Sequence, residues 1–346
     1  MKSLRLVGFV MVVICLLINL FLYSSVQAAP SEQPVIKLKF GGVWNTNNPN
    51  AMADLSWIDK IQKDTKGRVQ IEYFPAATLV SSGEHYAELV QGVCDISYAM
   101  VAYSKAGFEM HRRYMPFSYG ITNDETRRRI YTEILQKFPP VAAEWNKTKM
   151  LGITPGSNFQ LFSTKPVRTL TDLRGMQIRA TGSYVDLVKM LGGEGVTLPA
   201  SDTYPSLQKG IVQGTLAPWE SFKSLRYAEV TKYATVLNLT ATPYAMRAMN
   251  LNSWNKLPPD IQTIFNASIR FYEQEGDKQI QAADKGGLEF AKQQGAEVIN
   301  LSSEELKKLY STMETICRQV AADLDKKGYP GTAMFEEIRS LADKYK

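Results

Sequence analysis

Residues 169–218 read TLTDLRGMQIRATGSYVDLVKMLGGEGVTLPASDTYPSLQKGIVQGTLAP. The segment alternates short apolar runs with stretches of helical spacing, and glycines end the helices or turn the chain. Strands and helices are expected in turn at 176–180, 184–192, 195–199, 202–210 and 212–218. Such an order predicts a βαβαβ unit and therefore a domain of the α/β class.

The first of these strands ends on Arg179, and a Thr-Gly-Ser turn then opens the next helix. A permanent positive charge at the end of a buried strand requires a negative partner, because an unpaired buried charge is costly. An ion pair with an internal acid is one explanation and a bound anion is the other. The residues alone leave both open.

The same alternation extends toward the amino terminus. Apolar runs at 35–43, 68–75, 95–102 and 150–156 are expected strands, with helical spacing between them. A further strand is expected at 158–163. We therefore predict two α/β units, the first with a largely parallel sheet.

One long helix is expected from Asp260 to Gln294, because apolar residues recur there at helical spacing. At about 1.5 Å per residue it would be roughly 50 Å long, longer than one domain of this size, so we expect it to brace both. Gly276 and the Gly286–Gly287 pair are positions where it could bend or split. Two amphipathic helices finish the chain.

The amino terminus has the pattern of a secretory signal peptide. Basic Lys2 and Arg5 precede an apolar run from Leu6 to Tyr23, and Val26-Gln27-Ala28 supplies small residues for cleavage. We expect residues 1–29 to be removed and the mature chain to lie in the periplasm of a Gram-negative cell. An uncleaved membrane anchor is the alternative, since the apolar run is long.

Charge and cysteine content exclude several classes of protein. Removing Lys2 and Arg5 lowers the formal charge from +6 to +4, a mild excess, and the arginine run 127–129 is interpreted as a solvated helix face. No nucleic-acid partner is expected. Cys94 and Cys317 lack the spacing of a zinc or redox site. A disulfide between them is compatible with export but not implied.

A catalytic apparatus is not evident. His85 and His111 are the two histidines of the chain, and neither has the spacing of a metal site or a catalytic triad. We therefore expect no enzyme activity, no metal and no cofactor. An exported two-domain α/β protein of this kind most often binds a ligand in the cleft between its domains.

Several segments resemble one family. They are DLRGMQIR (172–179), LPASDTYPSLQKGIVQG (198–214), YAEVTKY (227–233), WNKLPPDIQ (254–262) and GEHYAELVQGVCDISY (83–98). Together they are similar to the solute-binding subunit of tripartite ATP-independent periplasmic (TRAP) transporters, the C4-dicarboxylate-binding protein family. The resemblance covers essentially the whole mature chain.

The resemblance implies the two-lobed periplasmic binding protein fold, with hinge strands and a long helix bracing both lobes. Lobe I would comprise residues 30–155 and about 241–258, lobe II residues 156–240, and residues 259–346 would form the brace and C-terminal helices. The resemblance also implies that Arg179 pairs with a ligand carboxylate. A guanidinium suits this role because its planar fork of donors matches two carboxylate oxygens.

Three residues differ from those of sialic-acid-binding members of the family, and these differences narrow the expected class of ligand. Phe159 stands where sialic-acid-binding members have a second arginine, Met100 falls near a pocket glutamate and Ala217 near an asparagine. With one arginine and many apolar groups, we predict a monocarboxylate with an apolar or aromatic body; a C4-dicarboxylate is the alternative. The candidate ligand-binding residues are Arg179, Phe159, Trp219, Ser183, Met100, Tyr103, Trp44, Asn158, Ser201, Tyr204 and Tyr244.

Other interpretations remain open at this stage. Trp44, Tyr103 and Trp219 are equally consistent with packing in a core or between lobes. An ABC-type binding protein or a sensory subunit would share the cleft, and an enzyme is the least favoured class. In the family, the two lobes close around the ligand and the closed form docks on membrane permease subunits. We expect a monomer.

Overall fold

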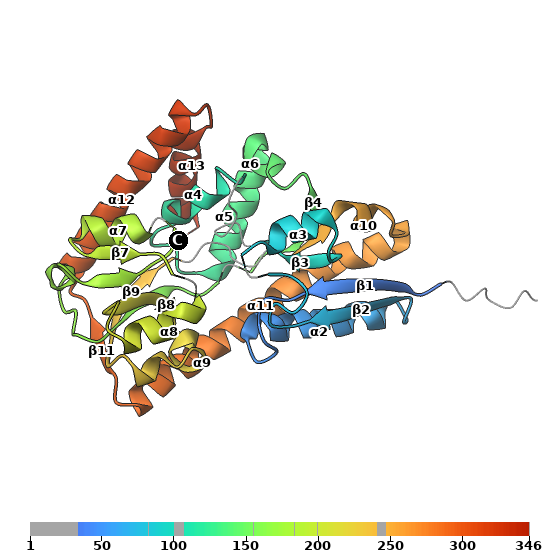
Figure 1. Ribbon diagram of the computed structural model, residues 1–346. Helices are drawn as coiled ribbons and strands as arrows, with labels where there is room; N and C mark the ends of the chain where they lie inside the picture. The colour runs from blue at the N-terminus through green and yellow to red at the C-terminus, as the bar shows by residue number, and fades with distance from the viewer. Residues whose placement is uncertain are drawn as a thin grey trace, which may run out of the picture. The chain divides into compact units, whose positions relative to one another are not determined.

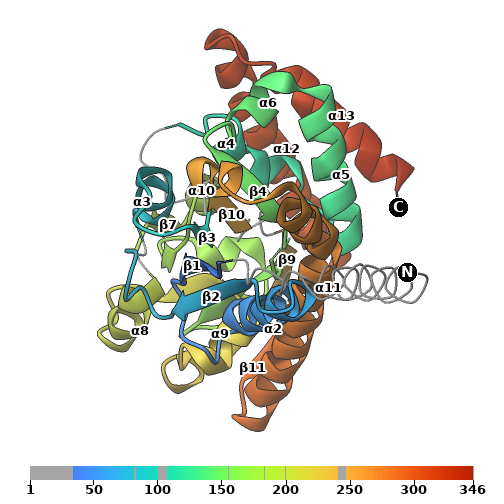
Figure 2. The same ribbon diagram turned by 90° about the vertical axis from the view of Figure 1, so that its right-hand side faces the viewer.

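The computed structural model describes residues 34–81, 83–99, 107–154, 156–182, 184–198, 200–240 and 247–345 (Figures 1 and 2). The contacts divide the chain into Met1–Ile36 and Lys37–Lys346, and the fold and cavity described below belong to the second unit. The expected signal peptide lies outside the described residues. Of the helices in the described part, none is both long and apolar enough to cross a membrane.

The first sheet has the order β2-β1-β3-β10-β4. Its strands are β1 (Ile36–Gly41), β2 (Val69–Phe74), β3 (Ile96–Tyr98), β4 (Thr148–Gly152) and β10 (Arg247–Asn250). β1 and β3 are parallel, whereas β10 runs antiparallel to both β3 and β4. β1, β3 and β4 therefore run in the same direction, as expected for a largely parallel sheet, and β10 is the exception. The chain returns from the second sheet and inserts β10 between two earlier strands in the reversed direction.

The second sheet has the order β11-β9-β5-β8-β6-β7. Its strands are β5 (Phe159–Ser163), β6 (Gln177–Arg179), β7 (Glu194–Val196), β8 (Gly214–Pro218), β9 (Tyr233–Leu239) and β11 (Glu297–Asn300). β6 is parallel to both β7 and β8. Helices α7 (Tyr184–Met190) and α8 (Ala200–Gln208) connect them. The predicted βαβαβ unit is confirmed.

Two apolar clusters cover the faces of the second sheet. One packs Leu161 and Ile178 against α7 and against α12 (Ser303–Lys326). The other packs Phe162 against α8, α9 (Trp219–Ser224) and the end of the long helix. The remaining helical elements are α2 (Pro49–Asp64), α3 (His85–Gln91), α4 (His111–Phe117), α5 (Asp124–Lys137), α6 (Pro139–Ala143), α10 (Leu251–Asn255), α13 (Gly331–Lys344) and the 3₁₀ turns η2 (Leu170–Leu173) and η3 (Tyr227–Glu229). Figure 2 shows α13 alongside α5, which it contacts.

The long helix α11 runs without interruption over Pro259–Gln293. Its 35 residues span about 52 Å at about 1.5 Å per residue. It packs on α2 beside the first sheet and on α9 beside the second, as Figure 1 shows. The helix therefore braces both halves, and its glycines do not split it.

The chain passes from β4 to β5 through a crossing segment, residues 153–158. Arg127 Nη1 donates to Asn158 Oδ1 at 2.9 Å, and Arg127 Nη2 donates to the Gly156 carbonyl at 2.8 Å. Arg128 donates to the Ile153 carbonyl and to Asp277 on α11. Both arginines are buried, so the expectation of a solvated face was wrong for them. They hold the crossing segment to α5 and α11.

The two cysteines of the described chain and His111 are buried. Cys94 and Cys317 are both free thiols, so they form no disulfide. His111 lies between Glu144, Tyr131 and Trp145, and burial lowers the pKa of its imidazole. Among the described residues, no group of three or more His, Cys, Asp or Glu side chains could hold a metal ion.

Candidate functional site

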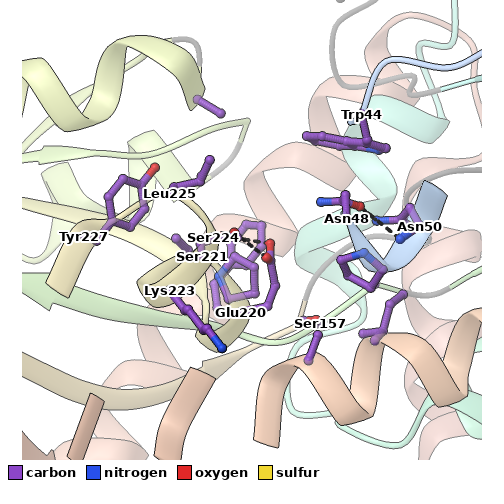
Figure 3. A pocket seen from close by; sticks show the side chains of 18 of the residues that line it. Trp44, Asn48, Asn50, Ser157, Glu220, Ser221, Lys223, Ser224, Leu225 and Tyr227 are labelled. Atoms are coloured by element: carbon purple, nitrogen blue, oxygen red, sulfur yellow. Dashed lines mark hydrogen bonds between the residues drawn. The ribbon is translucent and has the colours of Figure 1, made fainter. Parts of the chain in front are cut away.

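A cavity of about 740 Å³ lies where the two sheets and α11 meet. Its lining comes from the loop after β1 and the first turn of α2, the crossing segment, the ends of β6 and β8, α9, and the middle of α11. The lining residues used below are Phe159, Arg179, Leu216 and Ala217, together with Trp44, Asn48, Asn50, Ser157, Glu220, Ser221, Lys223 and Ser224. Figure 3 labels the last eight. The volume suits a small organic ligand.

Arg179 is the last residue of β6 and leaves only 6 % of its surface exposed. Its Nε donates to the Leu198 carbonyl at 3.1 Å, and Nη1 reaches the Leu216 carbonyl at 3.4 Å. Within the described part of the chain, its hydrogen bonds go to backbone oxygens and not to a carboxylate. The cavity therefore holds a guanidinium charge that these residues do not neutralise, a charge suited to a ligand anion.

The opposite wall is formed by residues 44–50, before and at the start of α2. Asn48 caps α2, because its Oδ1 accepts from the Asn50 backbone N at 2.9 Å. With its oxygen engaged, the amide nitrogen of Asn48 is left as a donor and points toward the cavity in Figure 3. The Trp44 indole N–H has no hydrogen-bond partner among the described residues.

A buried ion pair behind this wall fixes the start of α2. Arg247 on β10 pairs with Asp54 on α2, and both side chains are almost fully buried. The Arg247 guanidinium stacks 3.6 Å from the Tyr98 ring centroid and donates to the Asn50 carbonyl. Burial raises the pKa of Asp54 to about 6, although Arg247 opposes the shift.

The wall formed by α9 carries Glu220. Its carboxylate accepts from the Ser221 hydroxyl at 2.9 Å and from the Ser224 hydroxyl at 2.6 Å. The Glu220 backbone N–H donates to Asp284 on α11 at 3.1 Å. Burial raises the pKa of Glu220, and it raises the pKa of Asp284 to about 7. In the described structure, Glu220 forms no ion pair with a lysine or arginine.

The structure brings together three of the candidate residues: Arg179, Phe159 and Trp44 line the cavity, as does Ala217. Trp219, Asn158 and Tyr204 are not among the residues that line it.

Each of these three side chains has another partner. The Trp219 ring packs edge-on against Phe162, 5.5 Å away, in the core of the second sheet. Asn158 accepts from Arg127, and the Tyr204 hydroxyl bonds to Glu229 at 2.8 Å. Four further candidates, Met100, Tyr103, Ser183 and Tyr244, lie outside the described residues, as does the side chain of Ser201.

Sequence reasoning missed the polar part of the cavity. It described one arginine in an otherwise apolar cleft, whereas Glu220, Lys223 and asparagines of the 45–50 loop also line the space. One signal could have found them. Ligands of α/β folds bind beyond the carboxyl ends of strands. Residues 44–50 come shortly after β1, and residues 219–225 directly follow β8.

Comparisons with known proteins agree with this architecture. The family model of the bacterial extracellular solute-binding proteins, family 7 (DctP), matches residues 40–323. The C4-dicarboxylate-binding periplasmic protein DctP of Rhodobacter capsulatus is 23% identical over 288 residues, which cover 77% of this chain and 83% of the relative.

Solved structures show the same fold. A TRAP periplasmic solute-binding protein from Desulfovibrio salexigens superposes with a TM-score of 0.78 at 27% identity, over 90% of this chain and 97% of the other. A TRAP solute-binding protein from Rhodoferax ferrireducens gives a TM-score of 0.80 at 24% identity, over 90% and 98%. These proteins are solute-binding proteins and not enzymes. The chain belongs to the bacterial extracellular solute-binding proteins of family 7, the two-lobed solute-binding proteins of TRAP transporters.

Proposed function

We propose that this protein captures a small monocarboxylate with an apolar or aromatic body in the cavity and delivers it to a TRAP-type membrane permease. TRAP solute-binding proteins bind small organic acids and work with such a permease, and family members are periplasmic. Residues 1–29 would act as the export signal, and the mature chain would work as a monomer.

The Arg179 charge carries the proposal. The guanidinium is held by two backbone carbonyls at the cavity wall and, among the described residues, is not neutralised by an acid. A ligand carboxylate would supply the missing negative charge and could take two parallel hydrogen bonds. The ligand is therefore expected to bind with its carboxylate at the end of β6.

Two observations support a single carboxylate. Phe159, Leu216 and Ala217 form an apolar part of the wall beside Arg179. Glu220 places an acidic group elsewhere on the same wall, which would repel a second ligand carboxylate. The Rhodoferax protein was obtained with benzoate. At 24% identity, the likeness shows that the two proteins share a fold and does not identify the ligand of this protein. Benzoate is therefore used only as a first probe.

A C4-dicarboxylate is the second candidate. Lys223 also lines the cavity, and its ammonium could pair with a second carboxylate. The Rhodobacter relative is named as a C4-dicarboxylate-binding protein. However, Lys223 is exposed and its Nζ lies 5.7 Å from the Phe290 ring centroid, which favours a position at the edge of the cavity.

The mechanism would be closure of two lobes about the crossing segment. Lobe I would comprise residues 30–155 and about 241–258, and lobe II residues 156–240. Residues 259–346 would form the brace and the C-terminal helices. The ligand would favour the closed state because it contacts both walls only there.

A ligand screen tests the proposal. Thermal shifts would be measured with aromatic, branched oxo and hydroxy acids and with C4-dicarboxylates, and hits would be titrated by calorimetry. Arg179→Ala should weaken the best hit at least about 100-fold, since breaking a desolvated charge pair costs about 3–5 kcal/mol. Arg174→Ala is the control, because Arg174 is exposed and lies outside the cavity lining.

Two outcomes would contradict the proposal. Unchanged affinity in Arg179→Ala would reject the carboxylate anchor. Tight succinate binding without any response to aromatic or branched acids would reject the monocarboxylate.

A further inference from the structure

We propose that Glu220 is a specificity-determining residue that accepts a hydrogen bond from a hydroxyl group on the body of the ligand. The ligand would then be a hydroxylated monocarboxylic acid. This inference rests on the proposed function, because it places the ligand carboxylate at Arg179. It adds a second recognition point and therefore a narrower ligand class.

The two recognition points belong to one continuous wall. Arg179 on β6 is paired in register with Thr215 on β8. β8 then runs past the cavity to Pro218, about 10 Å further at about 3.3 Å per residue, and α9 begins with Trp219 and Glu220. A ligand anchored at Arg179 and lying along β8 would therefore reach Glu220 with a part remote from its carboxylate.

Glu220 is held ready to accept a hydrogen bond. The Ser221 and Ser224 hydroxyls each donate to one of its two carboxylate oxygens, which fixes the orientation of the group. A carboxylate has about four acceptor sites, so two hydrogen bonds leave further sites open. Figure 3 shows the carboxylate on the cavity side of α9.

The charge of Glu220 is not balanced locally. Lys223, the lysine of α9, places its Nζ 5.7 Å from the Phe290 ring centroid. Glu220 forms no ion pair with any of the described residues. A half-buried acid without a cation is unfavourable for the unliganded protein, and such groups concentrate at binding sites. Burial accordingly raises the pKa of Glu220.

A hydroxyl matches the two walls better than an ammonium does. Glu220 offers acceptors from α9, and the Asn48 amide nitrogen is a donor on the opposite wall. A hydroxyl both donates and accepts, so it could bond to both groups when the lobes close. An ammonium only donates and would leave the Asn48 N–H groups without an acceptor.

Matched pairs of acids test this inference by calorimetry. The probes are benzoate with 3- and 4-hydroxybenzoate, and phenylacetate with mandelate and phenylglycine. In the wild-type protein, at least one hydroxylated acid should bind about 10- to 100-fold more tightly than its parent, as expected for a hydrogen bond to a charged group. In Glu220→Gln, this preference should fall below about threefold.

Two further variants make the test specific. Glu194→Gln is the matched control, because Glu194 is exposed on β7 and outside the cavity lining. Asn48→Asp keeps an oxygen to cap α2 but replaces the donor with an acceptor, so it should weaken the hydroxylated acids more than their parents.

The possible failures are distinguishable. Equal binding of parent and hydroxylated acids by the wild type, an unchanged preference in Glu220→Gln, or tighter binding of phenylglycine than of mandelate would overturn the role of Glu220. Failure of the wild type to bind any monocarboxylate of the ligand screen, or undiminished binding by Arg179→Ala, would instead overturn the proposed function.

Discussion

Asp284 carries a carboxyl group on α11 at the point where the brace meets the crossing segment and α9. It accepts from the Glu220 backbone N–H, and the Ser157 side chain is a further hydrogen-bond partner. Burial outweighs these bonds and raises the pKa of Asp284 to about 7. Between about pH 4 and pH 7, the folded protein therefore keeps a proton that the unfolded chain has already released.

The stability of the protein should reflect this proton. Because the folded state binds it more tightly, the free energy of unfolding should fall as pH rises through that window. Asp284→Asn keeps an acceptor oxygen without the charge, so it should raise Tm by about 2 °C at pH 8 and leave it unchanged near pH 4. Differential scanning calorimetry across pH would measure this. Glu289 is an exposed acid on the same helix. An equal Tm shift in Glu289→Gln would show that the net charge of the protein, and not the proton on Asp284, is responsible.

Single residues were predicted with uneven success. The strand-end position of Arg179 followed from a local pattern, because the Thr-Gly-Ser turn marks where β6 stops. The burial of Arg127 and Arg128 did not, because their partners lie in the crossing segment and on α11, far along the chain. Glu220 directly follows β8, so its place beyond a strand end was predictable, but the segments that face it across the cavity were not.

At the scale of one element, α11 shows what periodicity can and cannot predict. Apolar spacing predicted its length, and the structure confirms one continuous helix. The same sequence suggested that glycines could break it. Instead, Gly276 and Gly287 are contact points: an added Cβ would lie 2.2 Å from Thr154 and 2.1 Å from the Trp219 carbonyl oxygen.

Adjacent glycines allow a matched test of that contact. Gly287→Ala should destabilise the protein by about 1–3 kcal/mol, because the methyl group meets backbone that cannot move aside cheaply. Gly286→Ala meets nothing within 4 Å and should stabilise it by up to about 1 kcal/mol through helix propensity. Urea unfolding followed by circular dichroism would compare them. Equal stability of the two variants would show that the approach of α11 to α9 is not tight.

The order of the strands in a sheet cannot be predicted from local sequence patterns alone. The unit of β6, β7 and β8 was predictable because short connections favour neighbouring parallel strands. β10 was not, since it enters the first sheet after the chain has completed most of the second. In the structure, Arg247 on β10 contacts Asp54 and Asn50 of α2, nearly two hundred positions earlier in the chain.

For the molecule as a whole, the proposed mechanism predicts closure on binding. A saturating ligand at about 100 times its Kd should add about 2.7 kcal/mol to the free energy of unfolding. It should also reduce the radius of gyration measured by small-angle X-ray scattering, because both walls then contact the ligand. At that concentration Arg179→Ala, with a Kd at least about 100-fold higher, should be at most half saturated and gain no more than about 0.4 kcal/mol. A higher melting temperature without any change in scattering would favour a preformed site.

The burial of the two cysteines has a practical consequence. Burial raises the pKa of the Cys94 thiol to about 11 and also raises that of Cys317, so neither is readily available as a thiolate. Asn47, in contrast, is exposed at the rim of the cavity. A cysteine introduced there in the chain from residue 30 onward would react selectively with a maleimide dye. The protein is thus suited to conversion into a fluorescent sensor for its own ligand.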